Sequence, residues 1–173
     1  GATTSISTKA IVGLILNLSH RIAEADRFVR KGEFHGFQFN LFLGNEIKDN
    51  IIGIIGLGNI GRNVTKILKN GFGCKVCYYD CKRDENFEKE FNIEFISSLS
   101  EILKISDIIS IHVPLCEQTK YLINKNNLKL MKPSAYIINT SRGAVICEND
   151  LVDALKNKII QGAALDVFEN EPV

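Results

Sequence analysis

The sequence predicts an α/β protein built on one doubly wound parallel sheet. Short apolar runs such as Ile51–Ile55 alternate with segments of helical periodicity along most of the chain, a pattern typical of parallel strands joined by right-handed helical crossovers. A glycine-rich turn follows the first run, and polar residues stand where several later runs end. In an open α/β sheet the carboxyl ends of the strands form the ligand-binding edge.

Length and composition fit one domain. The chain has 173 residues, which is enough for one domain with a well-buried core but too few for a second domain. Its net charge is +1. Acidic and basic residues are interspersed, which indicates neither a nucleic-acid surface nor a polybasic membrane anchor. The longest strongly apolar stretch, residues 10–18, is far shorter than the roughly 20 residues that span a bilayer.

The cysteines indicate free thiols in a reducing, cytoplasmic compartment, because their number is odd. The pair Cys74-x-x-Cys77 lies inside an expected strand, so the two side chains should project to opposite faces. We therefore predict strand-packing thiols there and no metal site.

Residues 1–48 are expected to belong to the nucleotide-binding domain whose core is residues 49–173. Residues 5–31 should form one long helix, and the connector that follows is rich in phenylalanine. The sequence is compatible with two arrangements of this connector. It could be buried against another surface, or it could cover a small satellite core. The helix face is predicted from Ala10, Leu14, Leu18, Ile22 and Ala25, and the connector holds Phe34, Phe37, Phe39 and Phe42.

The motif Gly56-x-Gly58-x-x-Gly61 lies between the strand Ile51–Ile55 and a helix expected over residues 59–69. Gly56 permits the turn, Gly58 admits a pyrophosphate to the backbone, and Gly61 allows close packing of helix on strand. The helix N-terminus offers unpaired N–H groups to phosphates. The flanking strand and helix are the context the motif requires, so the fold is predicted to be Rossmann-type. The helix should bury Ile60, Val64, Ile67 and Leu68.

Asp80 follows a second expected strand, residues 74–79. A carboxylate at this position accepts hydrogen bonds from the ribose hydroxyls of NAD and repels the 2′-phosphate of NADP. NAD is therefore the predicted cofactor. Lys82 and Arg83 lie close enough to oppose this preference.

Strands and helices continue to alternate beyond Asp80. Helices are expected over residues 84–91, 124–130 and 148–156, and after the capping box Ser98-x-x-Glu101. Strands are expected over residues 94–96, 107–112, 135–139 and 162–165. Their carboxyl ends bring Pro114 and Thr119, the run 139–143 and Asp166 to the edge that carries the glycine turn.

Three further runs resemble the D-isomer-specific 2-hydroxyacid dehydrogenases, and the likeness extends over nearly the whole chain. They are residues 131–143, residues 162–172, and His112-Val-Pro-Leu115 with Thr119. The resemblance implies the nucleotide-binding domain of an NAD-dependent oxidoreductase that transfers a hydride between nicotinamide and a 2-oxo or 2-hydroxy acid. The connector, from residues 25–28 to 42–44, looks most like glyoxylate and hydroxypyruvate reductases, whereas the rest of the chain is equally similar to 3-phosphoglycerate dehydrogenases. We favour the former, and glyoxylate, hydroxypyruvate and 3-phosphoglycerate-type substrates are all compatible with the resemblance. Members of this family commonly form homodimers through this domain.

By the same resemblance, Arg142 binds the substrate carboxylate and carbonyl, and Glu171 pairs with a catalytic histidine. Asp166 contacts the nicotinamide end, and the backbone amides of Asn59 and Ile60 contact the pyrophosphate. The cofactor-groove residues implied are Val113, Pro114, Thr119, Thr140 and Ser141, and Arg142 is implied there as well as at the substrate.

The chain also departs from the family pattern. The general-acid histidine should lie downstream of Glu171, and neither His20, His35 nor His112 matches it. The substrate domain, built from sequence on both sides, is absent, so this chain alone is expected to be inactive. Asn59 stands where arginine is common, and Lys9 where glutamate is frequent.

Two other classes share such a domain. A non-catalytic NAD sensor resembling the C-terminal-binding corepressors is compatible with Arg142 and Glu171. An NAD-dependent hydrolase related to adenosylhomocysteinase is disfavoured by the runs 139–143 and 166–172.

Overall fold

A computed structural model of the chain describes residues 2–37 and 39–172, and within them the sheet has six strands in the order β3-β2-β1-β4-β5-β6. Every neighbouring pair is parallel, which confirms the predicted fold class. The strand order changes direction between β1 and β4, so ligands are expected where these two strands end. The strands are β1 (Ile51–Ile55), β2 (Lys75–Tyr79), β3 (Glu94–Phe95), β4 (Ile108–Ile111), β5 (Tyr136–Asn139) and β6 (Gly162–Leu165).

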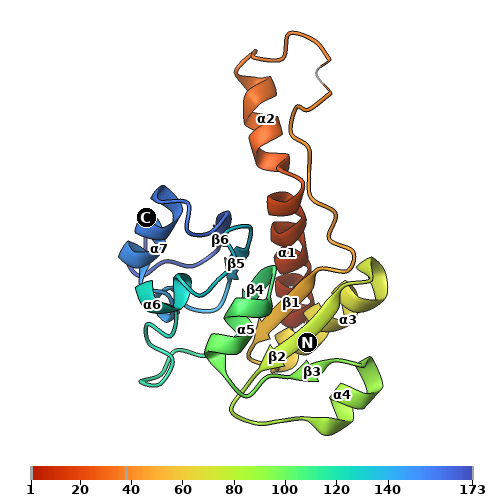
Figure 1. Cartoon of the computed structure of the whole chain (residues 1–173), viewed down its shortest axis with the longest axis vertical. Helices are drawn as coiled ribbons and strands as arrows, with labels where there is room; N and C mark the ends of the chain where they lie inside the picture. Colours follow the sequence, from red (N-terminus) through yellow and green to blue (C-terminus); the bar gives the residue numbers. More distant parts are fainter. Residues whose placement is uncertain (1, 38, 173) are drawn as a thin grey trace.

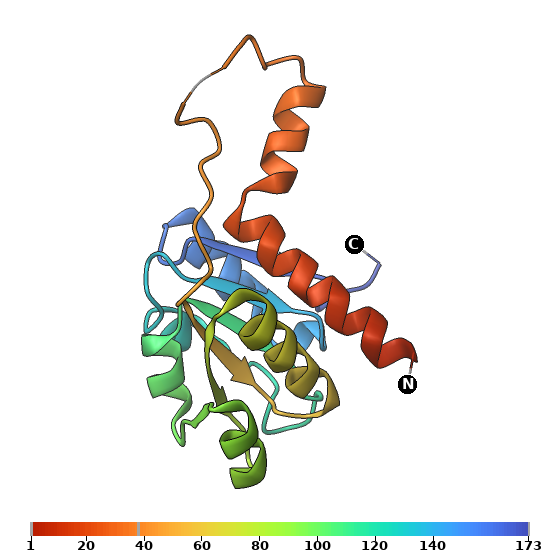
Figure 2. The ribbon, with the colours of Figure 1, turned by 90° about the vertical axis from the view of Figure 1, so that its right-hand side faces the viewer.

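Helices cover both faces of this sheet (Figures 1 and 2). Alternate strand residues point to opposite faces, so Ile52 and Ile54 pack with α1 and α3, whereas Ile55 packs with α5, α6 and α7. The helices are α1 (Ala2–Ser19), α2 (Ile22–Arg30), α3 (Asn59–Phe72), α4 (Glu85–Phe91), α5 (Leu99–Ile105), α6 (Lys125–Leu128) and α7 (Glu148–Lys156), with the 3-10 turn η1 (Gly143–Val145).

The prediction of one helix over residues 5–31 is wrong. The helix breaks after Ser19, where Arg21 adopts a left-handed conformation with φ 54°. The Asn17 side chain then accepts a hydrogen bond from the Ala23 amide, at 2.8 Å. The periodicity continues across this break, so it could not reveal the change in direction.

The buried face of α1 also differs from the prediction. Ala10 is exposed, and Leu14 and Leu18 are only half-buried. Packing of α1 on α3 and the sheet selects another row, Thr8, Ile11, Val12, Ile15 and Ser19. Both rows carry apolar residues, and a buried hydroxyl is tolerated because Ser19 Oγ donates to the Ile15 carbonyl at 2.9 Å.

Helix α2 and the connector after it project from the sheet as an arm (Figure 1). Phe37 and Phe39 are 88% and 81% exposed. Phe42 instead packs edge-on against Phe28, with ring centroids 5.2 Å apart. The connector therefore forms a small cluster around Phe42, whereas Phe37 and Phe39 expose apolar surface to solvent.

The remaining elements match the predictions to within a few residues. Ser98 Oγ accepts a hydrogen bond from the Glu101 amide, as expected of the helix cap. Cys74 and Cys77 are buried and belong to different clusters of the core, and the five cysteines are free. Within the described residues no cluster of three potential metal ligands occurs, and no helix is long and apolar enough to cross a bilayer.

Candidate cofactor groove

The glycine turn at the end of β1 is shaped by close backbone contacts. Gly56 has φ +98°, and a Cβ on Gly61 would lie 2.3 Å from the Gly56 carbonyl oxygen. A side chain at either position would force backbone movement. At Gly58, by contrast, a Cβ would meet nothing within 4 Å. Space therefore lies open beside Gly58, where α3 begins without a side-chain cap.

Asp80 is fixed against this turn. Its Oδ2 accepts a hydrogen bond from the Leu57 amide at 2.6 Å, and its Oδ1 accepts one from the Lys82 amide at 3.1 Å. The Gly56 amide also donates to the Tyr79 carbonyl at 2.9 Å. The ends of β1 and β2 are thus joined, and the carboxylate stands at the edge of the glycine turn.

A cavity of about 460 Å³ lies between this carboxylate and the segment that follows β4. Its lining is largely apolar beside one carboxylate, a composition typical of small-molecule sites. The predicted residues that it brings together are Gly56, Gly58, Asp80, Val113, Pro114 and Thr119. Residues that the sequence reasoning did not assign to the site also line it, namely Tyr79, Cys81, Cys116, Gln118 and Leu122.

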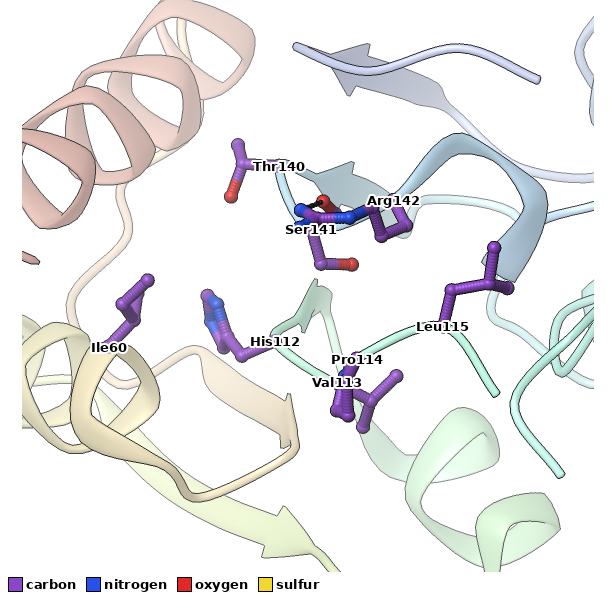
Figure 3. Close-up of a pocket in the computed structure, with 8 residues that line it drawn as sticks. All are labelled: Ile60, His112, Val113, Pro114, Leu115, Thr140, Ser141 and Arg142. Atoms are coloured by element: carbon purple, nitrogen blue, oxygen red, sulfur yellow. Dashed lines mark hydrogen bonds between the residues drawn. The ribbon is translucent and has the colours of Figure 1, made fainter. Parts of the chain in front are cut away.

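A second cavity, of about 410 Å³, is lined in part by the same segment (Figure 3). His112, Val113 and Pro114 line both cavities, so we treat the two as adjoining parts of one groove along the carboxyl edge of the sheet. The other predicted residues that line this second cavity are Ile60, Thr140, Ser141 and Arg142, joined by Leu115.

The loop that carries Arg142 is organised by Asn139, which is fully buried at the end of β5. Its Nδ2 donates to the Arg142 carbonyl at 3.0 Å, and its Oδ1 accepts from the Ser141 amide at 3.1 Å. The Arg142 side chain is exposed, and its Nη1 donates to the Ser141 carbonyl at 2.7 Å. Among the ion pairs of the described residues none involves Arg142, so its charge is available to an anion.

His112 stands between the two cavities. Its Nε2 lies 2.9 Å from Ser110 Oγ, and burial lowers the pKa of the imidazole to about 4. The ring is therefore neutral near pH 7. The sequence motif placed His112 in the cofactor-lining segment, and its contact with both cavities follows from its position after β4, next to β1.

Asp166 and Glu171 line neither cavity. The Asp166 side chain is exposed, although its amide pairs with the Asn139 carbonyl at 3.0 Å. Glu171 is also exposed, and its Oε1 accepts a hydrogen bond from the Phe168 amide at 2.9 Å. Asn59 and Gly61 are likewise absent from the lining, and Gly61 instead serves packing.

The loop before Glu171 is anchored beside Arg142. A Cβ on Gly143 would lie 2.0 Å from the Phe168 carbonyl carbon, so the two backbones are in direct contact. Glu169 Oε1 accepts from the Glu148 amide at 2.6 Å, and the Glu148 side chain accepts from the Glu169 amide in return. The loops that follow β5 and β6 are therefore held together.

Comparison with known proteins yields a family and several close relatives. Residues 12–173 match the family model described as D-isomer specific 2-hydroxyacid dehydrogenase, NAD binding domain. A glyoxylate reductase of Thermococcus litoralis is 45% identical over 176 residues, covering 99% of this chain and 53% of that protein. The chain spans about half the length of the curated relatives it matches.

Solved structures agree. The TT0316 protein of Thermus thermophilus superposes with a TM-score of 0.93 at 32% identity, covering 100% of this chain and 53% of that one. The NAD complexed form of a D-isomer specific 2-hydroxyacid dehydrogenase from Lactobacillus delbrueckii ssp. bulgaricus gives 0.84 at 33% identity, covering 95% and 48%. The corepressor alternative receives no support from these comparisons.

Proposed function

Because this chain belongs to the family of NAD-binding domains of D-isomer specific 2-hydroxyacid dehydrogenases, we propose that it is the cofactor domain of an NAD-dependent oxidoreductase acting on a 2-oxo or 2-hydroxy acid. The observation that carries the proposal is one groove with Asp80 beside the glycine turn at one end and Arg142 at the other. Because the relatives are named glyoxylate reductases, we propose glyoxylate as the first candidate substrate to test.

The residues of the groove fit a dinucleotide. The open space at Gly58 and the uncapped start of α3 suit a pyrophosphate, to which Asn59 and Ile60 would offer backbone amides. The Asp80 carboxylate suits a ribose diol, and the apolar wall at Val113 and Pro114 suits a flat ring. Thr119 would line the adenosine side, and Thr140, Ser141 and Asp166 would lie towards the nicotinamide.

NAD, when bound, supplies the hydride chemistry of the reaction. The role of the chain is to place charge around the reacting carbonyl. We assign to Arg142 the binding of the substrate carboxylate and the polarisation of its carbonyl, because a guanidinium stays charged and binds carboxylates in a bidentate manner.

Proton transfer needs a group other than His112. With a pKa of about 4, the His112 imidazole holds almost no proton to donate near pH 7. We therefore retain Glu171 as the partner of a general-acid histidine supplied by the complete protein. A neighbouring carboxylate would orient that histidine and favour its protonated form.

The arm supports a proposal about assembly. Its exposed phenylalanines form an apolar surface next to α2, and a homodimer joined there would cover them. We also propose that residues 1–48 form part of the cofactor domain, because α1 packs on α3. The free thiols agree with a cytoplasmic protein.

Calorimetric titration of this chain with NAD, and separately with NADP, tests the proposal. NAD should bind, and Asp80→Ala should weaken binding about 10- to 100-fold, because a hydrogen bond to a charged group contributes about 1.5–3 kcal/mol. Glu90→Ala, at an exposed acid on α4 outside the groove, is the matched control. Failure of the wild-type chain to bind NAD, or equal effects of the two variants, would contradict the assignment.

A further inference from the structure

Arg83 is the cation best placed to reverse the cofactor preference. It follows Asp80 by three residues, on the loop from β2 to α4. An arginine in this region of the fold can accept the 2′-phosphate that distinguishes NADP from NAD. The preference of the groove therefore depends on where the Arg83 guanidinium is held.

The structure shows Glu88 holding it. Arg83 Nε lies 3.0 Å from Glu88 Oε1 and Nη2 lies 2.8 Å from Oε2, a bidentate pair. The guanidinium also lies over the Phe95 ring, 5.7 Å from its centroid. Both contacts direct the side chain towards β3 and α4, and Arg83 is absent from the lining of the groove.

Glu88 is the fixed member of this pair. Its side chain is only 11% exposed, whereas that of Arg83 is 54% exposed. Glu88 Oε1 also accepts a hydrogen bond from the Tyr78 hydroxyl at 2.7 Å, and Tyr78 is fully buried in β2. The carboxylate is thus anchored to the sheet, and the arginine is the partner that could move.

The other cations near this end of the groove do not replace Arg83. Arg62, in the first turn of α3, pairs with Asp84, and its guanidinium lies 4.8 Å from the centroid of the Phe87 ring. Lys82 forms no ion pair among the described residues, and its amide donates to Asp80 Oδ1. Its ammonium is a compact point charge and lacks the planar fork of donors with which a guanidinium binds a phosphate in a bidentate manner. The negative charge of Asp80 therefore faces the ribose position without a guanidinium beside it.

We propose that Glu88 is a positioning residue for cofactor specificity: by binding Arg83 it withholds the guanidinium from the 2′-phosphate of NADP and so strengthens the preference for NAD. This inference rests on the proposed function, because it concerns the same groove. Glu88 acts through Arg83 and does not itself touch the cofactor.

The test is a set of calorimetric titrations of this chain with NAD and NADP. Glu88→Gln keeps an oxygen that can accept from Tyr78 but removes the charge that holds Arg83. It should tighten NADP binding about 10-fold, the equivalent of one charge-assisted hydrogen bond, and change NAD binding less than about twofold. Adding Arg83→Ala to this variant should abolish the gain, whereas Arg83→Ala alone should leave NADP binding at the wild-type value.

Glu85→Gln is the matched control, because it makes the same change in net charge on the same helix at an exposed acid. A similar gain in that variant would show a general charge effect and overturn the inference. A gain that persists without Arg83, or no gain in Glu88→Gln, would also overturn it.

The outcomes separate this inference from the proposed function. NAD binding that depends on Asp80, without a gain of NADP binding in Glu88→Gln, would overturn only the role of Glu88. No binding of either cofactor to any of the chains would overturn both.

Discussion

The two ends of the groove are built differently. At the Asp80 end, the carboxylate and the glycine turn are joined by hydrogen bonds to backbone amides, and close backbone contacts leave no room for a side chain at Gly61. At the other end, the Arg142 side chain is exposed and, within the described residues, donates only to the neighbouring Ser141 carbonyl. The first end is preorganised, whereas at the second the backbone is held by Asn139 and the charged side chain remains free to turn.

This difference suggests that the two ends have separate functions, one in cofactor binding and the other in substrate binding. We expect the preorganised Asp80 end to bind the cofactor without rearrangement, which lowers the entropy cost of association. We expect the exposed Arg142 side chain, by contrast, to turn towards a substrate anion after the cofactor is in place. Damage at one end should therefore affect the other end less, and variants of Arg142 and Gly61 test this expectation.

Arg142→Ala should have the largest effect. In the complete protein kcat/KM for 2-oxo acids should fall about 10²- to 10³-fold, the scale observed when one donor to a developing oxyanion is removed. NAD binding to this chain, measured by calorimetry, should fall far less than kcat/KM does, because the Asp80 end of the groove stays intact. Arg142→Lys keeps the charge but loses the bidentate geometry, so its activity should lie between the two. Near-normal turnover of Arg142→Ala would exclude the proposed role.

Gly61→Ala should damage the opposite end. The new methyl group would lie 2.3 Å from the Gly56 carbonyl oxygen and 3.2 Å from Ile54 Cγ2, and overpacking of this kind costs about 1–3 kcal/mol of the free energy of unfolding. Urea denaturation measures the loss, and NAD titration should show weaker binding.

Gly71→Ala, in the same helix, is the control for Gly61→Ala. A Cβ at Gly71 would meet nothing within 4 Å, so stability should stay constant or rise by up to about 1 kcal/mol through higher helix propensity. Equal destabilisation by the two substitutions would show that the close contact with the Gly56 carbonyl does not account for the loss in the free energy of unfolding.

His112 borders both cavities and should show a smaller, pH-dependent effect. Its pKa is about 4 in the folded protein and 6.5 as the ordinary value, so the unfolded chain binds more protons between these pH values. The free energy of unfolding should therefore fall as the pH drops from about 6.5 to about 4, by at most about 1.4 kcal/mol per pH unit.

Thermal or urea denaturation across this pH range tests the effect of His112. His112→Gln should flatten the profile in this window, whereas His35→Gln, at an exposed position of the connector, should leave it unchanged. Identical slopes in the wild-type chain and His112→Gln would assign the pH dependence to other groups.

Features with short-range signals could be predicted from the sequence. The strands β1 and β6 and the helix α7 begin and end as predicted, because their periodicity and flanking turn residues lie within a few positions of one another. The glycine turn and Asp80 were recognisable because a dinucleotide motif has a fixed spacing. Their convergence with Arg142 followed from the rule that parallel strands end at the same edge.

Features that depend on packing could not be predicted. Two rows of α1 are apolar, and only contact with α3 and the sheet decided that Ile11 and Ile15, and not Ala10, are buried. The break at Arg21 leaves the periodicity intact. The roles of Asp166 and Glu171 come from the family resemblance and remain predictions, since the structure places neither side chain in the groove.

The sequence by itself determined the α/β class, the strand-turn-helix at Gly56 and the acidic residue that follows β2, because each of these is encoded by neighbouring residues. Only the tertiary structure decided how charges are distributed around that site. Arg83 and Glu88 are close in sequence, yet their pairing depends on Tyr78 and Phe95, which the sheet brings together from adjacent strands. A long charged side chain pairs with the oppositely charged groups that tertiary packing holds within its reach. The positions of those groups depend on the whole fold.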